Sequence, residues 1–167
     1  MEWLLLALVA LLMTGGSGVA GTAGSNSAKR ELFIQQAMKE LNWPYVTGGE
    51  SRAEGGFDCS GLTYRAYNDS GLALPFAYRR VTEQAEHAPF KLNLKGQSIE
   101  YMKANIPRGF CIGTGFKWVD GVLRYEHVGI YLGNGQILQA SASKGKVVIS
   151  PFTSYWHDEF RMAYSWV

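Results

Sequence analysis

The sequence predicts a single-domain α+β protein in which helices come first along the chain and a mainly antiparallel sheet follows. Two observations carry this prediction. Up to about residue 104 the apolar residues recur at helical spacing, whereas from residue 108 onward short β-branched and aromatic runs alternate with glycine-containing turns. The length of 167 residues is enough for one domain with its own core, and no internal repeat is visible.

Composition excludes several classes of protein. A hydrophobic content of 47% with 13% aromatic residues is typical of a packed globular domain and not of a disordered chain. The 16 basic and 14 acidic residues give a net charge of +2 without a basic cluster, so no nucleic-acid partner is predicted. The three scattered histidines lack metal-ligand spacing, so we expect no metal site. We also expect no other cofactor, and we expect the protein to be a monomer.

The amino terminus has the character of an export signal. Residues 3–13 form an apolar run, and small residues fill positions 14–27. Such a run is too short to span a hydrocarbon core of about 30 Å but suits a secretory signal. Since the usual positive charge before it is missing, a signal anchor or a non-standard export route remains open. We expect residues 1–27 to be a signal peptide or anchor plus linker, residues 28–167 to be the folded domain, and the protein to be exported.

The first helix is expected to begin at Ser27, a suitable N-cap, and to run to about Leu41. Phe33 and Ala37 lie four residues apart on its apolar stripe. The tripeptide at 42–44 ends it, because its proline cannot continue the helix. Further helices are predicted at about 59–68, 78–86 and 98–104.

Short strands are predicted in the second half of the chain, at residues 110–112, 116–119, 122–125, 127–132, 136–140 and 146–149. Asp120-Gly121 is the clearest hairpin signal among the turns that separate them.

The stretch GGFDCSGL at 55–62 places a cysteine at the start of a helix. Asp58 is a suitable N-cap, so Cys59 falls in the first turn, where unpaired N–H groups and the helix dipole favour a thiolate over a thiol. Cys111 lies in an apolar run and is expected to pack in the core. We predict that both cysteines are free thiols, because a bridge between them would consume the nucleophile.

A catalytic thiol needs a base and a group that orients the base. His87 and His157 lie in polar segments typical of surface loops, whereas His127 begins a strand. Alternation along that strand predicts that Val128 faces the core and that Tyr131 shares a cleft-lining face with His127.

The return strand of the following hairpin determines what can contact His127. With a three-residue loop at 133–135, Leu132 pairs with Gln136, and Gln139 then lies diagonal to His127 on the same face, where it can accept a hydrogen bond. A slip of one residue turns Gln139 toward the apolar face, which is costly for an amide. A solvent-facing glutamine is the alternative from this argument alone.

Four motifs occur in a fixed order: PYVTGG at 44–49, FDCSGL at 57–62, LP at 74–75 and HVGIYLGNG at 127–135. From about residue 27 onward the chain resembles the NlpC/P60 cysteine peptidases. The resemblance implies a papain-like α+β fold and hydrolysis of peptidoglycan stem peptides, commonly between D-γ-glutamate and a diamino acid such as meso-diaminopimelate.

The resemblance also implies roles for individual residues. Cys59 corresponds to the nucleophile, His127 to the general base and Gln139 to the polar third member of a triad. Asp58 and Ser60 are implied to bind the stem peptide, and Tyr45 to line the cleft near the thiol.

The sequence departs from the family pattern in two places outside this set. Phe110 stands where relatives have an acidic residue, and residues 117–126 form a longer excursion before the histidine motif. An amidase or acyltransferase acting on another acyl donor, and a wall-binding protein without catalysis, are the alternative functions. An inhibitory or delivery partner is also left open.

Overall fold

The computed structural model of the chain describes residues 17–153, 156 and 162–167. Its helices are α1 (Ser17–Met38), α2 (Cys59–Asp69), α3 (Val81–His87) and α4 (Ile99–Asn105), with 3-10 turns η1 (Arg52–Glu54) and η2 (Phe76–Tyr78). Its strands are β1 (Glu50–Ser51), β2 (Gly56–Phe57), β3 (Phe90–Asn93), β4 (Cys111–Val119), β5 (Val122–Gly133), β6 (Gln136–Ser141), β7 (Lys146–Pro151) and β8 (Met162–Ser165). The prediction of an α+β protein is confirmed.

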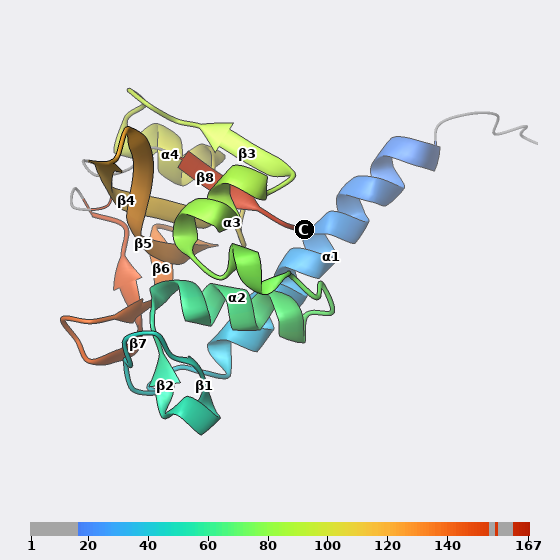
Figure 1. The fold of residues 1–167 in the computed structure, drawn as a ribbon. Coiled ribbons are helices and arrows are strands. Elements are labelled where there is room, and N and C mark those ends of the chain that lie inside the picture. The colour runs from blue at the N-terminus through green and yellow to red at the C-terminus, as the bar shows by residue number, and fades with distance from the viewer. Residues whose placement is uncertain (1–16, 154–155, 157–161) are drawn as a thin grey trace, which may run out of the picture.

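The main sheet has the strand order β3-β8-β4-β5-β6-β7, and every neighbouring pair is antiparallel. Helices α1, α2 and α3 lie together against this sheet, with α2 beside α1 (Figure 1). β1 and β2 pair in a small separate ribbon next to the start of α2.

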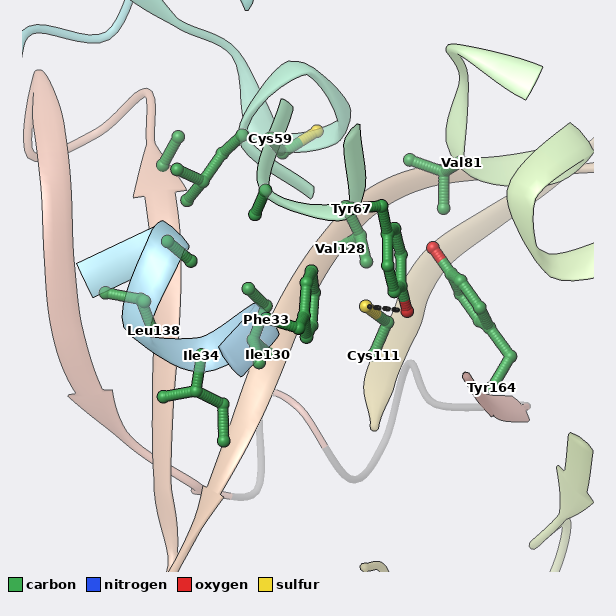
Figure 2. Close-up of a cluster of buried hydrophobic side chains, with 14 of the residues drawn as sticks. Phe33, Ile34, Cys59, Tyr67, Val81, Cys111, Val128, Ile130, Leu138 and Tyr164 are labelled. Atoms are coloured by element: carbon green, nitrogen blue, oxygen red, sulfur yellow. Dashed lines mark hydrogen bonds between the residues drawn. The ribbon is translucent and has the colours of Figure 1, made fainter. Parts of the chain in front are cut away.

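The larger hydrophobic core lies between the helices and the sheet. Figure 2 shows Phe33 of α1, Tyr67 of α2 and Val128 of β5 converging there, and all three are at most 1% exposed. Cys111 is fully buried in the same cluster, and its sulfur lies 3.3 Å from the hydroxyl of Tyr67. As predicted, Cys111 is a core residue, and both cysteines are free thiols.

The opposite face of the sheet carries a second core, made with α4, Phe152 and Trp156. Here the sequence prediction for Tyr131 was wrong. It is 1% exposed and packs with Ile137 and Phe152, so the face that it shares with His127 is mostly buried. A sheet covered on both sides alternates between two cores, and along β5 the residues that line a surface hollow are those at 124–127.

The structure corrects the start of the first helix. α1 begins at Ser17 and not at Ser27, so the described part of the small-residue tract is helical. Helix formation is cooperative, and a helix already fixed by packing at Phe33 extends by one bond per residue. The amino-terminal half of α1 projects beyond the rest of the domain (Figure 1).

Residues 1–16, which include the apolar run predicted as an export signal, lie outside the described residues. Among the helices that are described, none is both long and apolar enough to cross a membrane.

The strands are longer and more numerous than predicted. β4 joins two predicted runs through Gly113 and Gly115, and β5 likewise joins 122–125 with 127–132. Gly115 has a φ of 64°, so glycine absorbs a local irregularity here without ending the strand. β3 and β8 were missed, because four residues give too little periodicity to distinguish a strand.

The predicted hairpins form. Asp120 and Gly121 have positive φ values and connect β4 to β5. Between β5 and β6 the pairs Ile130↔Leu138 and Tyr131↔Ile137 follow the predicted register. The predicted pair of Leu132 with Gln136 is replaced by Gly133↔Gln136, with a bulge between 131 and 133.

Candidate active site

The loop before α2 and the first turn of α2 are joined through Asp58. Its Oδ1 accepts a hydrogen bond from Gly61 N at 2.7 Å, which caps the helix as predicted, and its Oδ2 accepts one from Gly48 N at 3.0 Å. Glycine is required at position 61, because a Cβ there would lie 2.0 Å from the carbonyl oxygen of Gly49. The loop therefore packs directly on the turn that carries Cys59.

The buried side chain of Arg79 stabilises this arrangement. Its guanidinium is 3.1 Å from Asp58, 2.6 Å from Glu50, 2.8 Å from the Ser60 hydroxyl and 3.1 Å from the Gly49 carbonyl. The side chain is only 10% exposed. One buried cation thus joins the loop, the cap and the first turn of α2.

Gln84 connects Arg79 to the first turn of α2 through buried hydrogen bonds. Its Nε2 donates to the carbonyl oxygens of Ser60 and Arg79, both at 3.1 Å, and its Oε1 accepts from the hydroxyls of Thr63 and Tyr164. No motif in the sequence analysis pointed to Arg79 or Gln84, since neither stands near the cysteine in the chain.

The thiol of Cys59 lies against the main chain at the start of β5. Its Sγ is 3.8 Å from the Glu126 carbonyl oxygen, and the N–H groups of Val128 and Ser60 favour its charged form. Even so, burial, followed by the nearby carboxylate of Asp58, raises the pKa of the thiol to about 11. The first-turn N–H of Ser60 lowers this pKa, as expected of the helix start, but burial outweighs it and the pKa of the thiol is raised overall.

His127 is held by an amide from the neighbouring strand. Its Nε2 lies 2.6 Å from Gln139 Oε1, and Gln139 Nε2 donates to Ser150 Oγ at 2.9 Å. Since the amide oxygen only accepts, the neutral imidazole carries its proton on Nε2 and leaves Nδ1 as the basic nitrogen. Burial lowers the pKa of His127, and the Gln139 contact partly offsets this. The predicted approach of Gln139 to His127 is confirmed as geometry.

The indole of Trp156 lies beside the His127 ring, with the ring centroids 5.3 Å apart. Gly129 makes this possible, because a Cβ there would meet Trp156 at 2.9 Å and Ile137 at 2.4 Å. The imidazole is therefore confined by an aromatic ring as well as by Gln139.

Cys59 and His127 open into two adjoining hollows of one surface. The first, of about 630 Å³, is lined by Cys59, Asp58 and Ser60, and the second, of about 520 Å³, by His127 and Gln139. Tyr45 and Glu126 line both hollows. Among the described residues no hydrogen bond joins the Cys59 thiol to the imidazole. The thiol instead contacts the backbone of the two residues that flank His127, Glu126 and Val128.

The remaining predicted residues lie at this site. Burial first, and then the neighbouring Cys59 and Asp58, raises the pKa of Tyr45, whose side chain lines both hollows. Ser60 is 6% exposed, and its hydroxyl accepts a hydrogen bond from Arg79.

Of the other two histidines, His87 does not line either hollow. It ends α3 and stacks on Tyr78, with the ring centroids 4.5 Å apart. His157 lies outside the described residues.

The fold and the site together define a papain-like α+β domain that brings a helix-start cysteine next to a strand histidine. Residues 42–165 match the model of the NlpC/P60 family. The chain belongs to this family.

Three relatives illustrate the similarity. The chain is 32% identical over 150 residues to peptidoglycan endopeptidase RipB of Mycobacterium tuberculosis, covering 79% of this chain and 54% of that protein. It is 34% identical over 128 residues to the gamma-DL-glutamyl hydrolase of Bacillus subtilis, covering 74% and 26%. The solved structure of RipB superposes with a TM-score of 0.65 at 28% identity, covering 94% of this chain and 74% of that one. The chain thus spans about half or less of the length of these two curated relatives.

Proposed function

We propose that the protein is a cysteine peptidase that hydrolyses peptidoglycan stem peptides at the bond between D-γ-glutamate and a diamino acid. The observation that carries this proposal is the placement of Cys59 at the start of α2, beside the strand that presents His127 hydrogen-bonded to Gln139. Family membership supports the reaction class. The names of RipB and of the gamma-DL-glutamyl hydrolase support the substrate and the type of bond.

The raised pKa of the thiol favours a resting pair of neutral thiol and neutral imidazole. In the first step Nδ1 of His127 takes the proton from Cys59 as the sulfur attacks the amide carbonyl carbon. The N–H of Cys59, in the first turn of α2, donates to the oxyanion that forms on the carbonyl oxygen.

His127 then gives its proton to the leaving amine, and the C–N bond breaks to leave a thioester on Cys59. Water attacks this thioester after His127 removes one of its protons, which releases the acid and restores the thiol. Gln139 holds the ring in one tautomer throughout, and Ser150 fixes the amide in turn. Asp58, Ser60 and Tyr45 bind the acyl side of the peptide near the thiol.

The test is hydrolysis of L-Ala-γ-D-Glu-meso-diaminopimelate, followed by mass spectrometry of the products. Wild-type protein should release L-Ala-D-Glu and free diaminopimelate, and Cys59→Ala should abolish the reaction while leaving the circular dichroism spectrum unchanged. Cys111→Ala is the matched control, because it removes the other thiol, which is fully buried and lines neither hollow, and it should retain activity. Activity in Cys59→Ala, or none in the wild type, overturns the proposal.

We also propose that the protein acts outside the cytoplasm, with residues 1–27 serving as signal peptide or anchor plus linker. Peptidoglycan as the substrate requires such a location. Fractionation of cells that produce the full chain, with and without residues 1–16, tests this. Retention of both forms in the cytoplasm contradicts it.

A further inference from the structure

The hollow next to His127 is lined by several serine hydroxyl groups and a lysine. Besides His127 and Gln139 it is lined by Ser141, Ser143, Lys144 and Ser150. We call it the serine hollow. These residues come from β6, β7 and the turn between them, none of which carries the thiol.

The hydrogen bonds in the serine hollow leave serine hydroxyl groups that can donate to a ligand. Ser150 Oγ accepts from Gln139 Nε2, so its own hydrogen remains available. Ser141 Oγ accepts from the backbone N–H of Lys144 and shares a 3.1 Å contact with Ser143 Oγ. When Ser141 donates in that contact, the hydroxyl hydrogen of Ser143 is left to donate to a ligand.

The serine hollow is lined by one cationic and one anionic side chain, Lys144 and Glu126. Lys144 is exposed and forms no ion pair within the part of the chain that the structure describes. The carboxylate among the lining residues is Glu126, and its charge is matched by an ion pair with Lys117. Hydroxyl donors with an unmatched ammonium group fit a carboxylate better than they fit a cation or an apolar chain.

The position of the serine hollow relative to the reaction determines which part of the substrate enters it. Cys59 bonds to the acyl half of the peptide, and His127 protonates the amine that leaves. The leaving residue therefore lies on the His127 side, where the serine hollow is.

We propose that the serine hollow binds the leaving-group residue of the substrate through a carboxylate, with Lys144 as the charged ligand and Ser143 and Ser150 as hydrogen-bond donors. The preferred leaving residue is then a diamino acid that carries an additional side-chain carboxylate, as diaminopimelate does and lysine does not. This inference rests on the proposed function, because it assumes that His127 faces the leaving amine.

The experiment compares two peptides that differ in charge and hardly in shape. One is L-Ala-γ-D-Glu-meso-diaminopimelate, and the other has the side-chain carboxylate of diaminopimelate replaced by a carboxamide. The wild-type kcat/KM should be about 10-fold higher for the acid, which corresponds to about 1.4 kcal/mol and is close to the lower end of what a hydrogen bond to a charged group contributes, because Lys144 is exposed. Lys144→Met should lower kcat/KM for the acid about 10-fold and for the amide less than 2-fold.

Two further variants sharpen the comparison. Lys144→Glu should reverse the preference, because it places like charges together. Lys146→Met is the matched control: Lys146 is exposed two residues away but does not line the serine hollow, and its removal should leave both peptides unaffected.

Binding to the hydrolytically inactive Cys59→Ala variant, measured by calorimetry, separates this inference from the proposed function. Cleavage of both peptides at equal rates, with Lys144→Met changing neither, overturns the carboxylate site and leaves the peptidase assignment intact. A wild type that cleaves neither peptide overturns the peptidase assignment. In that case equal binding of acid and amide to Cys59→Ala also overturns the carboxylate site.

Discussion

Arg79→Met should destabilise the whole domain, because the guanidinium is the shared partner of two carboxylates. Removing one member of a buried ion pair costs about 3–5 kcal/mol. The carboxylates of Asp58 and Glu50 keep 16% and 28% exposure, and Asp58 keeps two backbone donors, so the lower end of the range applies. We expect a loss of about 3 kcal/mol in the free energy of unfolding and a fall of about 6–12 °C in Tm.

The assay is urea unfolding followed by tryptophan fluorescence, with calorimetry for Tm. Arg79→Lys keeps the charge but not the fork of donors and should lie between wild type and Arg79→Met. Arg65→Met is the control: Arg65 forms an exposed pair with Asp69 one helical turn away, worth about 0.3–0.5 kcal/mol. The reasoning is refuted if Arg79→Met loses less than 1 kcal/mol, or no more than Arg65→Met.

Three further predictions concern the site and its support. Because the pKa of Cys59 is raised to about 11, alkylation by iodoacetamide should be about 100-fold faster at pH 9 than at pH 7, since the thiolate fraction grows tenfold per pH unit below the pKa; a rate that is flat between these values indicates a thiolate already formed at pH 7. Gln139→Ala should lower kcat about 10–100-fold with little change in KM, because it orients His127 without reacting, and an unchanged kcat in steady-state assays contradicts that role. Gly61→Ala should destabilise the domain by more than about 2 kcal/mol in urea unfolding, since its Cβ would overlap the Gly49 carbonyl, and wild-type stability is the contrary result.

Local signals were enough to predict the parts of the site that depend on neighbouring residues. The N-cap at Asp58 and the helix start at Cys59 follow from side-chain chemistry within a few positions. The approach of Gln139 to His127 follows from the strand register. Because side chains alternate between the two faces of a sheet, a register shifted by one residue would turn Gln139 to the other face.

The features that were missed depend on contacts between distant segments. Arg79 is 20 residues from Cys59, and its role depends on how the loop at 49–50 folds back over α2. The pKa of Cys59 depends on how deeply the packed domain buries the thiol, which the helix-start argument does not include. The burial of Tyr131 required knowing that α4 and Trp156 cover the second face of the sheet.

The proposed reacting groups belong to two different layers of the molecule. Cys59 is carried by α2, whereas His127 and Gln139 are carried by the sheet, and the apolar cluster shown in Figure 2 determines the spacing between the layers. A substitution such as Leu62→Ala, which removes bulk from this buried cluster, should therefore shift sulfur relative to imidazole without altering either group. If the proposed mechanism holds, the tolerance of the interior to mutation is limited by the alignment of sulfur and imidazole as well as by stability.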